Sequence, residues 1–186
     1  SGFPVITNHH GVAVELADYN QVTGIRIESA KSWGIHGSRI NGAFIANNTI
    51  MSSQNEGGIG IFDGSGPIQI TKTTLIGSKG DTKGIRIEST GYTATDALVK
   101  WNVINHFDSG VEIYGYDYSS IVSEISYNDI SSTRSVGIDV ESLDHNVSST
   151  AILNNTIHDN SSNGIWTYSK SDLKSNLLNN VFYHNN

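Results

Sequence analysis

Glycine recurs along this chain at the head of short alternating apolar segments, at intervals that match one coil of a solenoid. The intervals are 23, 24, 26, 26, 27 and 27 residues. A constant interval of about 20 to 50 residues indicates stacked repeats that pack against their neighbours alone. We therefore predict one solenoid, in which only outward-facing positions are open to a partner. The repeats begin at Gly11 (GVAV), Gly34 (GIHG), Gly58 (GIGI), Gly84 (GIRI), Gly110 (GVEI), Gly137 (GIDV) and Gly164 (GIWT).

A second apolar series keeps phase with the glycines, at intervals of 23, 26, 28, 26, 27 and 25 residues. Because a strand rises about 3.3 Å per residue, a repeat of this length must bend two or three times. From the second closing residue, Ile50, onward, the position two residues before each closing apolar residue carries an amide or a hydroxyl. Asparagine favours turns in general, but the constant register favours a ladder of hydrogen bonds between coils. The closing residues are Ile27, Ile50, Ile76, Ile104, Ile130, Ile157 and Phe182, and the polar column is Asn48, Thr74, Asn102, Asn128, Asn155 and Asn180.

Composition agrees with β-structure that has many turns. Charged residues are 16% of the chain, against about 25% in ordinary globular proteins. The 186 residues include 19 glycines and two prolines, which suits strands whose N–H groups bond to neighbours. We expect residues 1–10 to be a lead-in and residues 11–186 to be the array. The repeats run to both ends, so we expect a piece of a longer protein.

Charge and cysteine content narrow the class of partner. A formal net charge of −7 disfavours nucleic acid and anionic membranes, since binding to phosphate needs clustered Lys and Arg. No apolar run approaches the roughly 20 residues of a membrane span. The chain has no cysteine, which excludes disulfides and thiolate chemistry. These features fit an extracellular or cell-surface protein of a bacterium or phage.

Alternation along the glycine segments assigns each side chain to one face of its coil. The first and third residues after each glycine should point inward, and the second and fourth outward. The inward columns are Val12, Ile35, Ile59, Ile85, Val111, Ile138 and Ile165, and Val14, Gly37, Ile61, Ile87, Ile113, Val140 and Thr167. The outward columns are Ala13, His36, Gly60, Arg86, Glu112, Asp139 and Trp166, and Glu15, Ser38, Phe62, Glu88, Tyr114, Glu141 and Tyr168.

The succession of an NxI segment and a GIxI segment resembles the repeats of right-handed parallel β-helices in the pectin-lyase-like superfamily. The coils are most similar to those of mannuronan C5-epimerases, as in residues 127–140 (YNDISSTRSVGIDV) and 154–167 (NNTIHDNSSNGIWT). The resemblance covers nearly the whole chain. It implies an all-β, single-stranded right-handed parallel β-helix of about seven coils of 23 to 28 residues. It leaves function open, because such helices serve lyases, hydrolases, epimerases, phage tail spikes and adhesins.

The outward columns bring carboxylates and aromatic rings together. Adjacent coils lie about 4.8 Å apart, so Glu112 and Asp139 should be neighbours, with Arg86 beside Glu112. Paired carboxylates suit acid/base chemistry on glycans or could hold Ca²⁺ as a cofactor, whereas solvent-facing strand positions are often simply polar. The sequence contains no HExxH motif, so it gives no reason to predict a zinc site. The predicted catalytic residues are Glu112, Asp139, Tyr114 and Asp117, and the predicted glycan-binding residues are Arg86, Glu88, Tyr114, Tyr116, Glu141, Trp166 and Tyr168.

One segment comes near a catalytic motif of the family it resembles. Residues 114–117 (YGYD) match the first half of the epimerase run Tyr-Gly-Phe-Asp-Pro-His-Glu, whose Tyr, Asp and His move the proton at the sugar C5. Residues 118–120 (YSS) replace Pro-His-Glu, and the segment follows the glycine strand instead of lying within it. An exposed turn of tyrosines, useful for stacking, is the other interpretation.

These patterns predict an extracellular module that binds polysaccharide or another glycan, as in an adhesin or tail spike. The first alternative is a polysaccharide-processing enzyme, acting as a lyase, C5-epimerase or glycoside hydrolase. The second alternative is a structural spacer.

Overall fold

The chain winds through three parallel sheets, which we label A, B and C, because each repeat contains three short strands separated by corners. The computed structural model describes residues 2–7, 10–51, 55–78 and 81–186, in which 22 strands and no helix occur. Sheet A contains β1 (Val5–Thr7), β4 (Arg26–Glu28), β7 (Thr49–Met51), β10 (Thr74–Ile76), β13 (Val103–Asn105), β16 (Asp129–Ser131), β19 (Thr156–His158) and β22 (Val181–Tyr183). Sheet B contains β2 (Val14–Glu15), β5 (Trp33–Ser38), β8 (Gly57–Phe62), β11 (Lys83–Ser89), β14 (Ser109–Gly115), β17 (Ile138–Ser142) and β20 (Ile165–Ser169). Sheet C contains β3 (Asn20–Thr23), β6 (Asn41–Ala46), β9 (Ser65–Thr71), β12 (Ala94–Lys100), β15 (Ser120–Ser126), β18 (Val147–Leu153) and β21 (Asp172–Leu178).

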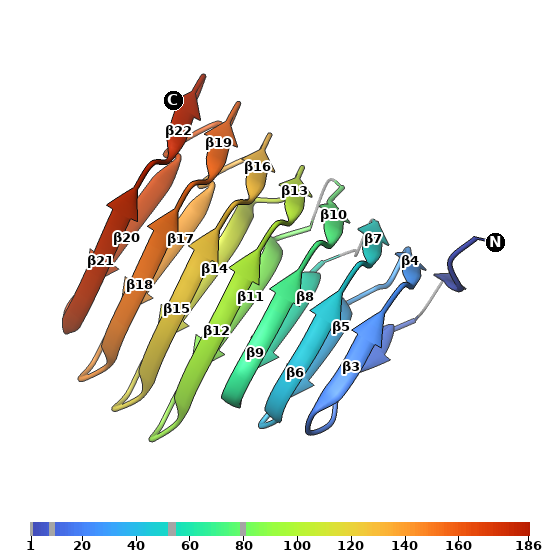
Figure 1. Cartoon of the computed structure of the whole chain (residues 1–186), viewed down its shortest axis with the longest axis horizontal. Coiled ribbons are helices and arrows are strands. Elements are labelled where there is room, and N and C mark those ends of the chain that lie inside the picture. Colours follow the sequence, from blue (N-terminus) through green and yellow to red (C-terminus); the bar gives the residue numbers. More distant parts are fainter. Residues whose placement is uncertain (1, 8–9, 52–54, 79–80) are drawn as a thin grey trace.

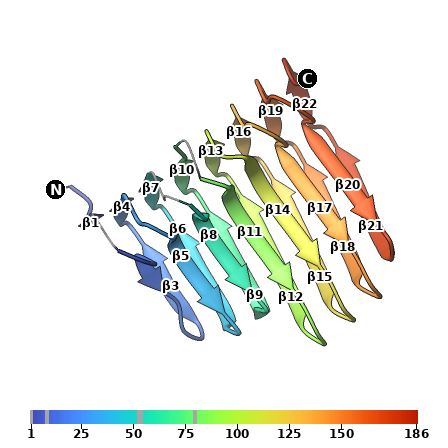
Figure 2. The ribbon, with the colours of Figure 1, turned by 180° about the vertical axis from the view of Figure 1, so that it is seen from behind.

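Successive coils stack along the long axis of the molecule. Figure 1 shows the strands of each sheet side by side from the blue N-terminal end to the red C-terminal end, and Figure 2 shows the same order from behind. Each strand pairs in parallel with the strand three places later in the chain. The predicted parallel β-helix is therefore confirmed. The array has about six coils and not seven, since the first coil is only partly formed and β2 has two residues.

Part of the predicted lead-in belongs to the first coil. Residues Val5–Thr7 form β1 and pair with β4. Residues 1, 8 and 9 of that segment lie outside the described residues.

The interior is filled by columns of β-branched side chains, as the alternation predicts. Ile59, Ile85, Val111 and Ile138 pair in register from β8 to β17 and are fully buried. Isoleucine and valine fit a pleated, buried surface well, and burial of each such side chain contributes about 1.5 to 3 kcal/mol. The core is one continuous apolar cluster along the axis.

The first glycine segment does not keep the predicted register. Val14, and not Val12, pairs with Ile35, so the segment is displaced by two residues relative to the second coil. Gly11 therefore does not lie beside Gly34. The displacement also moves Glu15 out of its predicted column.

Glu15 lies beside His36, in the first outward column. Its Oε1 is 2.7 Å from Nδ1 of His36. Leu16 takes the inward place that had been predicted for Val14, opposite Gly37, whose missing side chain leaves room for it. A shift of two residues keeps every side chain on its face, so alternation alone does not detect it.

The predicted series of closing apolar residues lies in sheet A, and its third member, Ile76, is wrong by one residue. Leu75, and not Ile76, pairs with Ile50 and is fully buried. Thr73 correspondingly replaces Thr74 in the polar column. Two adjacent apolar residues make the alternation ambiguous here, and a slip of one residue exchanges the faces.

The predicted asparagine ladder is present at the corner between sheets C and A. The backbone N–H of Asn102 donates to Oδ1 of Asn128 (2.9 Å), that of Asn128 to Asn155 (2.9 Å), and that of Asn155 to Asn180 (3.0 Å). Each amide also reaches a carbonyl of sheet C, as Nδ2 of Asn128 does to Val99 (2.9 Å). The ladder satisfies backbone groups that are buried at the corner, which a turn preference alone does not require.

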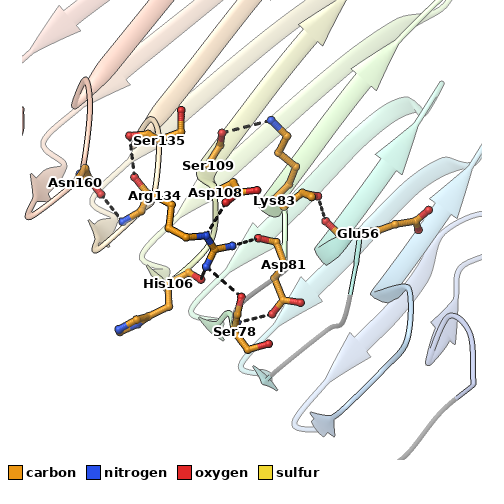
Figure 3. A network of polar contacts seen from close by, with 12 residues as sticks. Glu56, Ser78, Asp81, Lys83, His106, Asp108, Ser109, Arg134, Ser135 and Asn160 are labelled. Atoms are coloured by element: carbon orange, nitrogen blue, oxygen red, sulfur yellow. Dashed lines mark hydrogen bonds and ion pairs between the residues drawn. The ribbon is translucent and has the colours of Figure 1, made fainter.

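Arg134 ties three coils together at the corner between sheets A and B (Figure 3). Its guanidinium donates to Oδ1 of Asp108 (2.6 Å) and to the carbonyls of Ser78 (3.1 Å), His106 (3.0 Å) and Asp81 (2.5 Å). Asp81 is fully buried in this network, and burial raises the pKa of its carboxyl. These residues directly precede β11 and β14, so the network supports the strands that carry the candidate site.

Candidate functional site

The outer side of sheet B carries two adjacent columns of charged and aromatic side chains, which we call the B face. Parallel pairing from β11 to β20 places them in the predicted register. Glycan binding by these residues stays a prediction. The first column is Arg86, Glu112, Asp139 and Trp166, and the second is Glu88, Tyr114, Glu141 and Tyr168.

Two cations neutralise part of the B face. Glu112 is only 5% exposed. It forms ion pairs with Lys83 and with Arg86, whose Nη1 lies 2.8 Å from its Oε2. Arg86 also donates from Nη2 to Glu88 (2.5 Å) and lies 5.4 Å from the ring centre of Tyr114. A buried carboxylate needs such partners, so Glu112 is a fixed part of the surface and not a free base.

Asp139 is buried beside Glu112 without an equivalent partner. It is 8% exposed, and its Oδ1 accepts no hydrogen bond from the described residues. Burial, together with the negative charges of Glu112 and Glu141, raises the pKa of Asp139 to about 7, although Lys83 and Arg86 oppose the rise. Near neutral pH this carboxyl is therefore present in both protonation states, which suits a proton donor or acceptor.

The neighbouring groups of the second column are also perturbed. Burial raises the pKa of Glu141, and the charge of Glu112 adds to the effect. Burial likewise raises the pKa of Tyr114, with further contributions from Glu141 and Glu88. The hydroxyl of Tyr114 therefore keeps its proton at neutral pH and is available as a hydrogen-bond donor.

Strand β20 adds two aromatic side chains next to the carboxylates. The rings of Trp166 and Tyr168 are parallel to within 3°, with 5.6 Å between their centroids. Trp166 pairs in register with Asp139, and Tyr168 with Glu141. The two residues are 36% and 38% exposed. A flat apolar surface thus lies directly beside acidic groups.

Two predicted site residues lie beyond the end of the B face. Tyr116 and Asp117 follow β14 in the turn that leads to β15, and Tyr116 is 40% exposed. Asp117 and Tyr118 have positive φ angles of 53° and 57°. The ring of Tyr118 stacks between Tyr92 and His145, at 5.5 and 4.7 Å. The segment therefore has the form of the exposed aromatic turn that was its second interpretation.

Lys83 belongs to the site although the predicted columns begin only after each glycine. It precedes Gly84 and pairs in register with Gly57 and Ser109. Strict alternation gives Lys83 the same face as the buried Ile85, so the rule misses it. Only the ion pair with Glu112 shows that the Lys83 side chain lies on the outer side of the sheet.

The described residues contain neither a cluster of metal ligands nor a helix that could cross a membrane. These residues contain no group of three or more His, Asp or Glu side chains placed to hold a metal ion. Ca²⁺ binding stays a prediction. No helix in the same ranges is both long and apolar enough to cross a membrane.

The pKa of Asp139 predicts a pH dependence of stability. The carboxyl has a pKa of about 7 in the folded chain, against the ordinary pKa of 3.8 for an Asp carboxyl exposed to water, as in the unfolded chain. Between these values the folded state keeps a proton that the unfolded state has released, so the free energy of unfolding falls as pH rises from about 4 to about 7. Asp139→Asn should remove this loss and stabilise the protein at pH 8 by roughly 2 to 4 kcal/mol.

Urea unfolding at pH 5 and pH 8 measures the effect. The matched control is Asp117→Asn, because Asp117 is exposed in a turn with positive φ, which asparagine also tolerates. An Asp139→Asn variant that is less stable than the wild type at pH 8 would contradict the assignment of a buried, unpaired carboxyl.

Comparison with known proteins gives the family. A family model described as a right-handed β-helix region matches residues 33–186, a range that includes the whole B face. No curated protein and no solved structure matches the chain. The chain belongs to the right-handed β-helix family.

Proposed function

We propose that the B face binds polysaccharide, at the cell surface or outside the cell. The observation that carries the proposal is the exposed pair Trp166 and Tyr168, in register with Asp139 and Glu141. Parallel rings offer a flat apolar surface to sugar rings. The adjacent carboxylates accept hydrogen bonds from sugar hydroxyls. Flat apolar surface beside polar acceptors is the combination that a glycan requires.

The charge of the B face favours an uncharged glycan. Its two cations already pair with Glu112 and Glu88. Carboxylates in excess repel an anionic sugar and leave acceptors for neutral hydroxyls. The four carboxylates are Glu88, Glu112, Asp139 and Glu141, and the two cations are Lys83 and Arg86.

A glycan array followed by calorimetry tests this proposal. Trp166→Ala and Tyr114→Ala should each weaken binding of the recognised neutral glycan by about tenfold or more, since large aromatic anchors dominate such contacts. Tyr19→Ala is the control, because Tyr19 is 68% exposed and lies before β3, away from the B face. Binding that survives both B-face changes would refute the proposal. If the wild type binds no glycan at all, the spacer interpretation gains support.

A polysaccharide-processing enzyme is the second candidate, and the protonation of Asp139 favours it. A carboxyl with a pKa of about 7 and an unpartnered oxygen is suited to general acid or base chemistry. Asp139 and Tyr114 are the candidate catalytic residues on the B face, in a lyase, hydrolase or C5-epimerase. Glu112, by contrast, is held in ion pairs, and Asp117 lies in the turn beyond the B face. The glycans that bind are incubated with the protein and examined for shorter or epimerised chains. Asp139→Asn should abolish such a product but retain binding if the site is catalytic.

A further inference from the structure

The corner between sheets C and A holds one residue per coil in the left-handed backbone region. Each lies directly before the ladder position of its coil. In every coil except the last, its N–H donates to a carbonyl of the next coil, as in Trp101 to Ser126 (3.2 Å) and Tyr127 to Leu153 (3.1 Å). The corner residues and their φ angles are Gly24 (66°), Asn47 (56°), Lys72 (49°), Trp101 (57°), Tyr127 (55°), Asn154 (56°) and Asn179 (55°). The backbone therefore imposes the same conformation on every coil.

Three consecutive coils place residues at this corner that the conformation disfavours. Glycine and asparagine adopt a positive φ readily, and they occupy the corner at both ends of the array. Lys72, Trp101 and Tyr127 occupy it in the middle, although bulky side chains are uncommon there. A residue held in a backbone conformation that it disfavours, with no gain in stability, is a candidate for a functional role. At this corner the exceptions are confined to three adjacent coils, so their side chains lie close together.

The two aromatic side chains form an exposed surface with two ammonium groups beside it. Trp101 and Tyr127 are 50% and 49% exposed, and their ring centroids are 6.1 Å apart with planes at 35°. Nζ of Lys100 lies 4.5 Å from the Trp101 ring centre and 5.1 Å from that of Tyr127. Nζ of Lys72 lies 5.7 Å from the Trp101 ring centre. We call these four residues the corner patch.

Nearby carboxylates do not neutralise the corner patch fully. The closest approach to Lys100 is Oε1 of Glu124 at 3.8 Å, and that oxygen also accepts a hydrogen bond from Ser126 (2.6 Å). On the sheet A side, Asp129 faces His158, whose Nε2 is 3.0 Å away. Lys72 forms no ion pair with a described residue. The corner patch thus carries two ammonium groups against the one carboxylate of Glu124, in a chain whose net charge is −7.

We propose that the corner patch is a second glycan site, specific for an anionic polysaccharide. The ammonium groups of Lys72 and Lys100 pair with carboxylate or sulfate groups of the sugar. Trp101 and Tyr127 contact its ring faces. Coils repeat about every 4.8 Å, so residues on successive coils reach successive parts of an extended chain. The site is separate from the B face, and its charge selects the opposite kind of glycan.

A nucleic acid would also use cations and aromatic rings. It carries a phosphate on every nucleotide, however, and binding to it needs many more cations than the two found here. The overall negative charge of the chain repels a long polyanion of that charge density. A glycan whose charged sugars are fewer fits two ammonium groups better.

Substitution by the residue that other coils use at the same corner tests the proposal without disturbing the fold. The probes are hyaluronan and partly methyl-esterified polygalacturonate, in which only some of the sugars carry a free carboxylate, with fully methyl-esterified polygalacturonate as the uncharged control. Trp101→Asn, Tyr127→Asn and Lys72→Asn should each weaken binding of the preferred acidic glycan by at least about tenfold. The wild type should lose affinity as NaCl is raised. Glu124→Gln should strengthen binding, since it removes the negative charge that competes with the glycan for Lys100.

Stability and cross-controls separate binding from folding. Trp101→Asn and Tyr127→Asn should leave the urea midpoint unchanged or higher, because asparagine suits the positive φ better. Trp166→Ala, on the B face, should not alter binding of the acidic glycan. The proposal is overturned if no probe binds, if the full methyl ester binds equally well, if the asparagine variants bind normally, or if a single-stranded oligonucleotide binds more tightly than any glycan.

Discussion

Gly110→Ala is expected to destabilise the fold by about 3 kcal/mol or more, and so to abolish folding at physiological temperature or come close to it. A Cβ atom on Gly110 would lie 2.5 Å from the carbonyl oxygen of Gly137 and 2.5 Å from Cγ2 of Ile130. Both atoms belong to the next coil, and the first is backbone. Neither can move without shifting that coil, whose pairing is fixed on all three sheets.

Gly11→Ala is the matched control, since the sequence pattern puts Gly11 in the same series. No atom of the residues that the structure describes lies within 4 Å of a Cβ at this position. Its free energy of unfolding should change by less than about 0.5 kcal/mol. Chemical unfolding followed by far-UV circular dichroism compares the two variants. Equal losses for both would mean that the glycines serve the turns and not the close approach of coils.

Asn128→Ala should cost about 3 kcal/mol of unfolding free energy. Its Oδ1 accepts from the backbone N–H of Asn102 (2.9 Å), and its Nδ2 donates to the carbonyl of Val99 (2.9 Å). Alanine leaves both backbone groups unpaired inside the molecule, and each buried unpaired group costs about 1 to 3 kcal/mol. The measurement is again chemical unfolding.

Two further variants define the origin of this cost. Asn180→Ala should cost less, because Asn180 is only part-buried and water can replace its bonds. Asn128→Thr should recover part of the loss, since Thr73 already occupies one step of the ladder, with its Oγ1 3.5 Å from the N–H of Asn48. If alanine is tolerated equally at Asn128 and Asn180, the ladder contributes little to stability.

The fold was predictable because its two defining columns follow from close approach and from buried backbone groups. Glycine at Gly84 and Gly110 is required by the neighbouring carbonyl 2.5 Å from each missing side chain, so its spacing reports the coil length. Asparagine at Asn128 pairs with the backbone N–H of Asn102 and with the carbonyl of Val99, both at a buried corner. The errors at Gly11 and Ile76 arose where sequence alternation permits a slip.

The site was predictable in its register but not in its environment. Parallel strands in register bring Glu112 and Asp139 together from sequence spacing alone. Their burial, and the ion pair of Glu112 with Lys83, depend on side chains from neighbouring coils, whose conformations the alternation does not fix. Trp101 was hidden for a different reason, since its unusual backbone conformation becomes visible only when the corner dihedrals are compared.

The asparagine ladder also bears on how such a chain changes length over evolution. The steps from Asn102 to Asn128 and from Asn128 to Asn155 span 26 and 27 residues and present the same donors and acceptors to both neighbours. A duplicated or deleted gene segment of one such step would join without an unpaired edge inside the array. The length of the β-helix can therefore change by whole coils during evolution. Such a change leaves the chemistry of any one surface patch intact.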